Sequence, residues 1–147
     1  MKTTIVAEIG SNWEGSMKKA VKLISKCKDA GTDAVKFQIW RASDLYNSDH
    51  PGWSFIKRSE VTFKIAKKLK EFCDGYNVKF YCSAFYPEAV DYLESLNVTR
   101  YKIASRTCLL KDPFSKETLK RMAETKKPMI ISMGMGGDKK YIKKIFS

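Results

Sequence analysis

The sequence predicts an α/β protein built on parallel strands. Strand-like and helix-like hydrophobic periods alternate along the whole chain of 147 residues. Helical stretches of about 10–15 residues separate the strands, which is the pattern of repeated βαβ units. A composition of 44% hydrophobic and 30% charged residues excludes a disordered or fibrous chain. No linker or shift in composition divides the chain, so residues 1–147 are expected to form one domain.

The first half begins with an apolar run over 5–9, which is predicted to form a strand. Ser16 suits the N-cap of a helix over 17–30, because a serine hydroxyl accepts a hydrogen bond from an unpaired amide of the first turn. A second strand is expected over 34–39. A long loop carrying several aromatic side chains is then predicted over 41–60.

The second half repeats the alternation. A helix over 61–75 is expected to bury Ile65, Leu69 and Phe72 on one face. Pro87 suits the first position of another helix, because a proline there loses no hydrogen bond. The remaining segments are strands over 79–85, 100–105 and 129–133, and helices over 115–126 and from 139 onward.

Two architectures fit these elements, which amount to about four and a half βα units. One is an open five-stranded flavodoxin-like sheet with helices on both faces. The other is part of a TIM-type (β/α)8 barrel, which in full needs about 250 residues. Length favours the open sheet. The loop over 11–16, however, is a poor match to the hydroxyl-rich phosphate loop expected after the first strand of a flavodoxin.

Each predicted strand carries a polar residue inside or just after its apolar run, and active sites of parallel α/β folds lie at the carboxyl ends of strands. Lys36 and Lys102 are the most informative, because a lysine within an apolar strand is costly unless an anion or a carboxylate meets it. We therefore expect either a phosphate or carboxylate pocket, or structural ion pairs with Glu8 or another acid. The polar set is Glu8, Lys36, Gln38, Ser83, Lys102, Ser105 and Ser132.

The charge of the chain and the length of its apolar runs bear on whether it binds nucleic acid or a membrane. The chain has 28 Lys and Arg against 16 acidic residues, a net charge of +12. The lysines are spread over most of the predicted helices rather than gathered in one stripe, which favours solvated helix faces over a nucleic-acid surface. No apolar run reaches 18 residues, so no membrane partner is expected.

Four cysteines are present without a C-x-x-C pair, which predicts a reduced, cytoplasmic protein. His50 is the single histidine, so no histidine-based metal site is expected.

Four motifs resemble those of the sialic acid synthase family. Residues 7–15 (AEIGSNWEG) are similar to the opening A-E-I-G-x-N-H-x-G of that family, and 30–38 (AGTDAVKFQ) to its A-G-A-D-A-V-K-F-Q. Residues 101–105 (YKIAS) resemble Y-K-I-G-S, and 127–135 (KPMIISMGM) resemble K-P-x-I-x-S-T-G-M. The motifs follow the family order across the chain. The sequence therefore resembles the N-terminal part of the catalytic barrel of these synthases, which favours the partial (β/α)8 barrel.

The resemblance implies an activity and roles for the polar residues. Members of the family condense phosphoenolpyruvate with an N-acetylated amino sugar such as N-acetylmannosamine, in nonulosonic acid biosynthesis. By resemblance, Glu8 is the candidate catalytic residue for proton transfer. The residues expected to bind phosphoenolpyruvate, directly or in support, are Lys36, Gln38, Ser83, Lys102, Ser105 and Ser132.

The sequence also departs from the family pattern. Trp13 stands where the first motif has histidine, Arg106 and Thr107 replace Gly-Glu after Y-K-I-G-S, and Met133 replaces threonine. The family uses a divalent metal, manganese or magnesium, whose histidine ligands lie on later strands than those found here. We therefore expect a homodimer or a complementing chain to complete the site. The alternative is a non-catalytic half-barrel that binds phosphoenolpyruvate or another anion.

Overall fold

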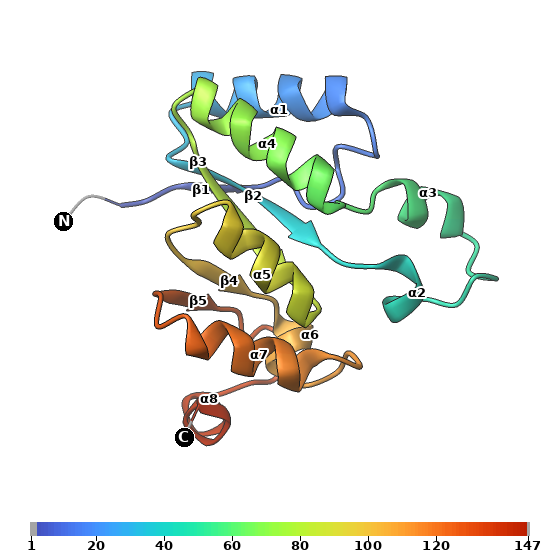
Figure 1. The fold of residues 1–147 in the computed structure, drawn as a ribbon, viewed down its shortest axis with the longest axis vertical. Coiled ribbons are helices and arrows are strands. Elements are labelled where there is room, and N and C mark those ends of the chain that lie inside the picture. Colours follow the sequence, from blue (N-terminus) through green and yellow to red (C-terminus); the bar gives the residue numbers. More distant parts are fainter. Residues whose placement is uncertain (1–2, 147) are drawn as a thin grey trace. The chain divides into compact units, whose positions relative to one another are not determined.

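The protein has an α/β fold, seen in a computed structural model that describes residues 3–146 (Figure 1). The chain divides into two compact units, one ending at Cys82 and the other beginning at Ser83. Each unit contains a pair of parallel strands together with helices. The predicted α/β class with parallel strands is therefore confirmed.

The sheet of the first unit consists of β1 (Val6–Glu8), β2 (Ala34–Ile39) and β3 (Lys79–Ala84), in that spatial order, with β3 ending just inside the second unit. β1 runs parallel to β2, and this register places Glu8 directly opposite Lys36. β2 is the central strand and is buried at all but one position. β1 has a strand partner on one side only among the described residues, and it is largely exposed.

Two long helices, α1 (Met17–Asp29) and α4 (Phe63–Gly75), pack against each other in this unit (Figure 1). Ser16 and Thr62 are their N-caps, and each hydroxyl accepts a hydrogen bond at 3.3 Å from the amide three residues later. The helices bury one face each, because their apolar residues recur every three or four positions. The buried residues are Ala20, Ile24, Ala66, Leu69 and Cys73.

The prediction that Phe72 lies in the core is wrong, because its side chain is 37% exposed. Cys73 is fully buried instead. The buried stripe of α4 steps from Ala66 to Leu69 and then to Cys73, and this spacing turns position 72 away from the core. Burial raises the pKa of the Cys73 thiol to about 12, so it remains a neutral, unreactive packing group.

The segment over 41–60, predicted as a loop, contains two short helices, α2 (Ala42–Leu45) and α3 (Trp53–Arg58). They have four and six residues, too few for a hydrophobic period to be recognised in the sequence. The two ends of the segment are held together, because the Glu60 carboxylate accepts a hydrogen bond from the Ala42 amide. It follows β2 directly at the carboxyl end of that strand (Figure 1).

The described residues of the second unit form two parallel strands, β4 and β5, and four helices. The helices α5 and α6 both pack against α7. The expected strand over 100–105 is shorter than predicted, because Ser105 begins a short helix. The elements are α5 (Pro87–Ser95), β4 (Tyr101–Ile103), α6 (Ser105–Cys108), α7 (Ser115–Glu124), β5 (Met129–Ile131) and α8 (Lys139–Phe146).

The strand order rules out the flavodoxin-like alternative. That fold has five strands in one sheet in the order 2-1-3-4-5. Here the described residues form a sheet of three strands in sequential order and a separate pair. Sequential parallel order is the arrangement that successive βα units give when each strand pairs with the next along the chain.

A buried tyrosine, a glutamate and a lysine form a network beside β4. The Tyr101 hydroxyl donates to Glu94 Oε1 at 2.5 Å, and Lys127 Nζ donates to the same oxygen at 2.7 Å. Burial disfavours the charged form of Glu94, but the two hydrogen bonds and the lysine charge outweigh it and hold the pKa of this carboxyl below its ordinary value of 4.5. No periodic pattern in the sequence indicates this network, which joins α5, β4 and the segment before β5.

Glu94→Gln is expected to destabilise the protein at neutral pH and not in acid. Because the pKa of Glu94 is lower in the folded than in the unfolded chain, its carboxylate stabilises the fold at pH values above 4.5. This contribution is lost as the pH falls through the lower pKa of the folded state. Because the carboxylate is partly exposed, the expected loss at pH 7 is at most about 1 kcal/mol. Urea denaturation at several pH values measures it, with the exposed Glu124→Gln as control. If the variant and the wild type differ in unfolding free energy below pH 3 by as much as they do at pH 7, this account is contradicted.

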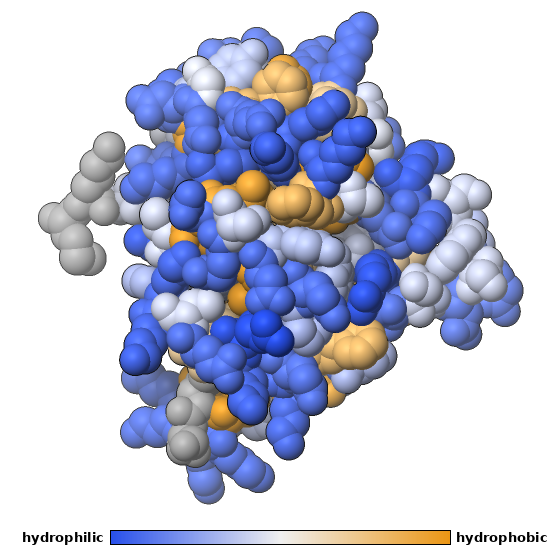
Figure 2. Space-filling model, in the orientation of Figure 1, coloured by the Kyte–Doolittle hydropathy of each residue, from blue (hydrophilic) through white to orange (hydrophobic). Residues whose placement is uncertain are grey.

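The face of the molecule in Figure 2 is mainly hydrophilic, with small separate apolar areas. Within residues 3–146, no helix combines the length and apolar character needed to cross a membrane.

Candidate functional site

The first cluster of predicted site residues lies at the carboxyl ends of β1 and β2. The register of these parallel strands sets Glu8 opposite Lys36, and the Glu8 carboxylate forms an ion pair with the Lys36 ammonium. The Lys36 side chain is almost wholly buried, whereas the Glu8 side chain is 52% exposed. The pair therefore joins a desolvated cation to an anion that solvent or a ligand can reach.

Gly10 and Gln38 lie beside this pair. The amides of Ile9 and Gly10 both donate to the Lys36 carbonyl, at 2.9 and 3.1 Å, which turns the chain sharply after β1. Gly10 takes a φ of 53°, and a Cβ at this position would lie 3.3 Å from Glu8 Oε1 and 3.9 Å from Gln38 Oε1. A glycine therefore leaves the backbone open next to two oxygen-bearing side chains.

The second cluster lies in the second unit, at the carboxyl ends of β4 and β5. Lys102 Nζ donates to the Ser132 hydroxyl and, at 3.1 Å, to the Ile103 carbonyl. The Ser105 hydroxyl accepts a hydrogen bond at 3.2 Å from the Gly134 amide. A lysine and two hydroxyls are thus held close to a glycine-containing backbone, a set of groups suited to an anion.

The structure therefore groups the predicted residues into two clusters. Glu8, Lys36 and Gln38 belong to the first unit, and Lys102, Ser105 and Ser132 to the second. Ser83 lies on β3 and is fully buried. The interpretation of Lys36 as half of an ion pair with Glu8 is confirmed, whereas the hydrogen bonds described for Lys102 involve a hydroxyl and a carbonyl.

Sequence reasoning missed the support of the second cluster. Arg106, next to Ser105, donates from Nε and Nη2 to Asp112 Oδ1 at 2.9 and 2.6 Å. Asp112 is buried, and its amide bonds the Ser115 hydroxyl at the start of α7. No periodic pattern marks position 112, so only the charge of Asp112 was available as a signal.

Cys82 lies close enough to the Glu8–Lys36 pair to interact electrostatically with both charges. Burial raises the pKa of its thiol strongly, and the lysine charge opposes this without overcoming it. A thiol that stays protonated is a poor nucleophile. Cys82 therefore packs beside the first cluster and is not a candidate for covalent catalysis.

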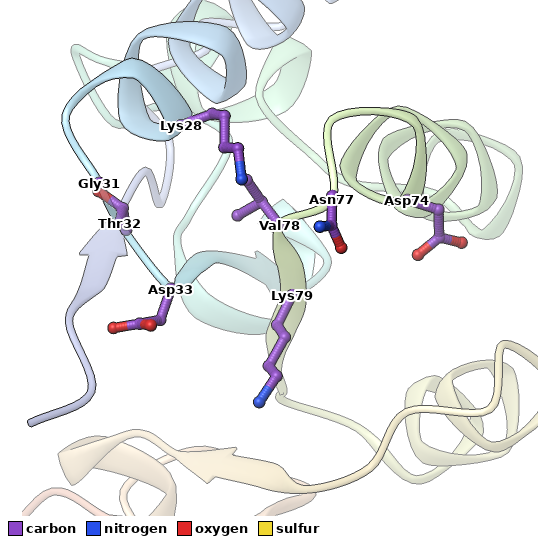
Figure 3. A pocket seen from close by; sticks show the side chains of 8 residues that line it. All are labelled: Lys28, Gly31, Thr32, Asp33, Asp74, Asn77, Val78 and Lys79. Atoms are coloured by element: carbon purple, nitrogen blue, oxygen red, sulfur yellow. The ribbon is translucent and has the colours of Figure 1, made fainter. Parts of the chain in front are cut away.

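A further hollow in the first unit, of about 500 Å³, lies at the opposite end of the strands (Figure 3). Lys28, Asn77 and Lys79 are among the side chains that line it, where α1 and α4 end and β3 begins. Conserved chemistry in parallel α/β folds belongs to the carboxyl ends of strands, and the amino ends serve stability. Lys28 is in the last turn of α1, where a cation is favourable beside the helix carbonyls.

No group of three or more His, Cys, Asp or Glu side chains within residues 3–146 is arranged to hold a metal ion. The two clusters offer lysines, hydroxyls and one accessible carboxylate, which is not a donor set for manganese or magnesium. The divalent metal implied by the family resemblance therefore does not fit the residues described here.

These features define a parallel α/β protein whose strands end in lysine, carboxylate and hydroxyl groups. The chain belongs to the NeuB family, whose model matches residues 23–145. It is 33% identical to the N-acetylneuraminate-9-phosphate synthase of Drosophila melanogaster and 30% identical to the N,N'-diacetyllegionaminic acid synthase of Legionella pneumophila. Each alignment covers 89% of this chain but only 37% and 39% of those proteins.

A solved structure shows the same arrangement of elements. The N-acetylneuraminic acid synthetase of Leptospira borgpetersenii, solved in complex with citrate, superposes with a TM-score of 0.85 at 25% identity. The match covers 99% of this chain and 50% of that one. The predicted family is thus confirmed. The two curated relatives named above are nonulosonic acid synthases, and this chain spans about two fifths of their length.

Proposed function

We propose that this chain forms the phosphoenolpyruvate-binding part of a nonulosonic acid synthase, which condenses phosphoenolpyruvate with an N-acetylated amino sugar such as N-acetylmannosamine. The observation that carries the proposal is the Glu8–Lys36 pair, in which a buried ammonium meets an accessible carboxylate at the carboxyl ends of two parallel strands. A charge buried at such a place is costly, and it is the kind of group that functional sites retain.

The proposed reaction forms one carbon–carbon bond. C3 of phosphoenolpyruvate attacks the aldehyde carbon of the open-chain amino sugar, and the aldehyde oxygen takes up a proton. Water adds at C2, and the C2–O bond to phosphate breaks, so that inorganic phosphate leaves and a 2-keto acid remains. No step is assigned to a metal ion.

The residues of this chain would hold the anion and move one proton. In the proposal, the ammonium groups of Lys36 and Lys102 compensate the phosphate and carboxylate charges, because charge-assisted hydrogen bonds to such groups are the strongest available. Glu8 serves as the proton-transfer group. The remaining contacts are given by Gln38, Ser83, Ser105 and Ser132.

The proposal includes a partial (β/α)8 barrel that needs more polypeptide. The superposition over half of a longer synthetase supports it, as does the sequential order of parallel strands. A homodimer or a complementing chain would then supply the missing strands and the rest of the acceptor site. Unpaired strand edges are rarely left open in native proteins, which supports a partner.

The test is calorimetric titration of the chain with phosphoenolpyruvate, with inorganic phosphate as the reference anion. We expect saturable binding of phosphoenolpyruvate that is tighter than that of phosphate and weaker by at least about tenfold in Lys36→Met. The exposed Lys68→Ala, on α4, is the matched control and should bind like the wild type. Circular dichroism establishes that each variant is folded.

Equal binding of both anions by the folded chain would overturn the proposal. The second candidate function, a half-barrel that binds the anion without turnover, is favoured by the departures at Trp13 and Thr107. It predicts tight phosphoenolpyruvate binding with no phosphate release when N-acetylmannosamine, manganese and the complementing polypeptide are supplied.

A further inference from the structure

A second hollow of about 570 Å³ lies between α2 and α3 in the first unit. The range typical of small-ligand sites is roughly 300–1,000 Å³. Its polar lining includes Ser43, Asn47, Asp49 and His50, and its principal aromatic wall is Tyr46, which is 37% exposed. None of these residues belongs to the two lysine clusters described above.

The walls of the hollow are held in place by local bonds. His50 Nδ1 accepts a hydrogen bond at 3.0 Å from the Gly52 amide, so the proton of the neutral ring is on Nε2. The ring also meets Tyr46 edge-on, with centroids 5.3 Å apart and planes at 65°. Arg41, which is not part of the lining, donates from Nε to Asp44 at 2.6 Å. These contacts hold His50 against Tyr46 and fix Asp44 before a ligand arrives.

The charge of the hollow differs from that of the rest of the chain. Asp49 and Asp44, the latter paired with Arg41, contribute to its lining, and no lysine or arginine does. Three other hollows of comparable size are each lined by at least two lysines. In a chain of net charge +12, this lining disfavours phosphate and carboxylate ligands and suits a neutral molecule rich in hydroxyl groups.

The available groups match the two surfaces of a sugar. A pyranose or an open-chain aldose presents C–H groups on its faces, which pack on an aromatic ring, and hydroxyls at its edges. Asp49 accepts hydrogen bonds from hydroxyls, His50 Nε2 donates, and Asn47 does both. The side chains of Asn47 and Asp49 make no hydrogen bond or ion pair to other described residues, which leaves their capacity for a ligand.

We propose that this hollow binds the neutral N-acetylated amino sugar, with Tyr46, Asn47 and Asp49 as its specificity-determining residues. The proposal rests on the function proposed above, and it locates the acceptor in the segment that follows the carboxyl end of β2. It also separates the two substrates by charge, since the anion belongs with the lysines and the neutral sugar with the carboxylates.

The test is an NMR titration of the isotope-labelled chain with N-acetylmannosamine, in the absence of phosphoenolpyruvate. We expect saturable shifts of amide signals over 43–52, and an affinity at least about fivefold lower in Tyr46→Ala and in Asp49→Ala. Asp29→Ala, an exposed acid at the end of α1, is the matched control and should leave the affinity unchanged. N-acetylmannosamine 6-phosphate should bind more weakly than the neutral sugar, because its phosphate meets the carboxylates.

Two results would overturn this assignment: no shifts over 43–52 in a folded chain, or an affinity unchanged in both pocket variants. Titration of the same variants with phosphoenolpyruvate separates the two proposals. Binding of phosphoenolpyruvate without binding of the sugar overturns the sugar site alone. Binding of the sugar without preference for phosphoenolpyruvate over phosphate overturns the proposed function instead.

Discussion

Trp13→Ala is expected to lower the free energy of unfolding by about 3–5 kcal/mol, the usual cost of truncating a buried aromatic residue. Trp13 is the largest of the fully buried side chains among the described residues, at 1% exposure. It lies in the turns between β1 and α1, which are fixed by successive backbone hydrogen bonds and therefore cannot collapse into the space left behind. Urea denaturation followed by circular dichroism measures the change.

Trp13→Phe is the matched variant for this prediction. The Trp13 Nε1–H has no hydrogen-bond partner among the described residues, so phenylalanine removes an unpaired donor together with part of the ring. We expect it to cost less than half as much as the alanine variant. A loss of less than about 1 kcal/mol in Trp13→Ala would contradict the packing described here.

Glu8→Ala is the variant with the second-largest expected effect. It leaves the ammonium of Lys36, which is 5% exposed, without its carboxylate partner. Breaking a fully buried pair costs about 3–5 kcal/mol, and the exposure of Glu8 reduces the expected loss in unfolding free energy to about 1–3 kcal/mol. Urea denaturation at pH 7 measures this loss.

Lys36→Met completes the comparison, because methionine fills a similar volume without a charge. We expect its unfolding free energy to lie within about 1 kcal/mol of the wild type, and the double variant to resemble Lys36→Met alone. Such a cycle isolates the coupling between the two residues. Full additivity of the two changes would show that the pair adds nothing to stability.

Long periodic elements were predictable from the sequence, and short ones were not. The strand over 34–39 and the helix from position 17 are found within a residue of their expected bounds. The helices α2, α3 and α6 have four to six residues and no apolar stripe of their own, so tertiary contacts define them. Phe72 was misplaced because its apolar character was given more weight than its angular position on α4.

The candidate site was predictable from the sequence where a charged residue interrupts an apolar strand. Lys36 was recognisable because it is a lysine within an apolar strand. The register of β1 and β2 places Glu8 opposite it, which explains their ion pair. The hollow between α2 and α3 was not predictable, since its side chains are ordinary loop residues in sequence. Only the turn that fixes His50 brings them to one place.

The open side of β1 has a consequence for the behaviour of the purified chain. Ile5 and Val6 expose apolar surface along a strand whose second row of backbone groups has no described partner. Such an edge is a template for uncontrolled addition of strands from other molecules, and thus for aggregation. β5 is better protected, because Lys126, Lys127 and Pro128 immediately precede it. Insoluble material formed at high concentration should therefore grow from the N-terminal strand.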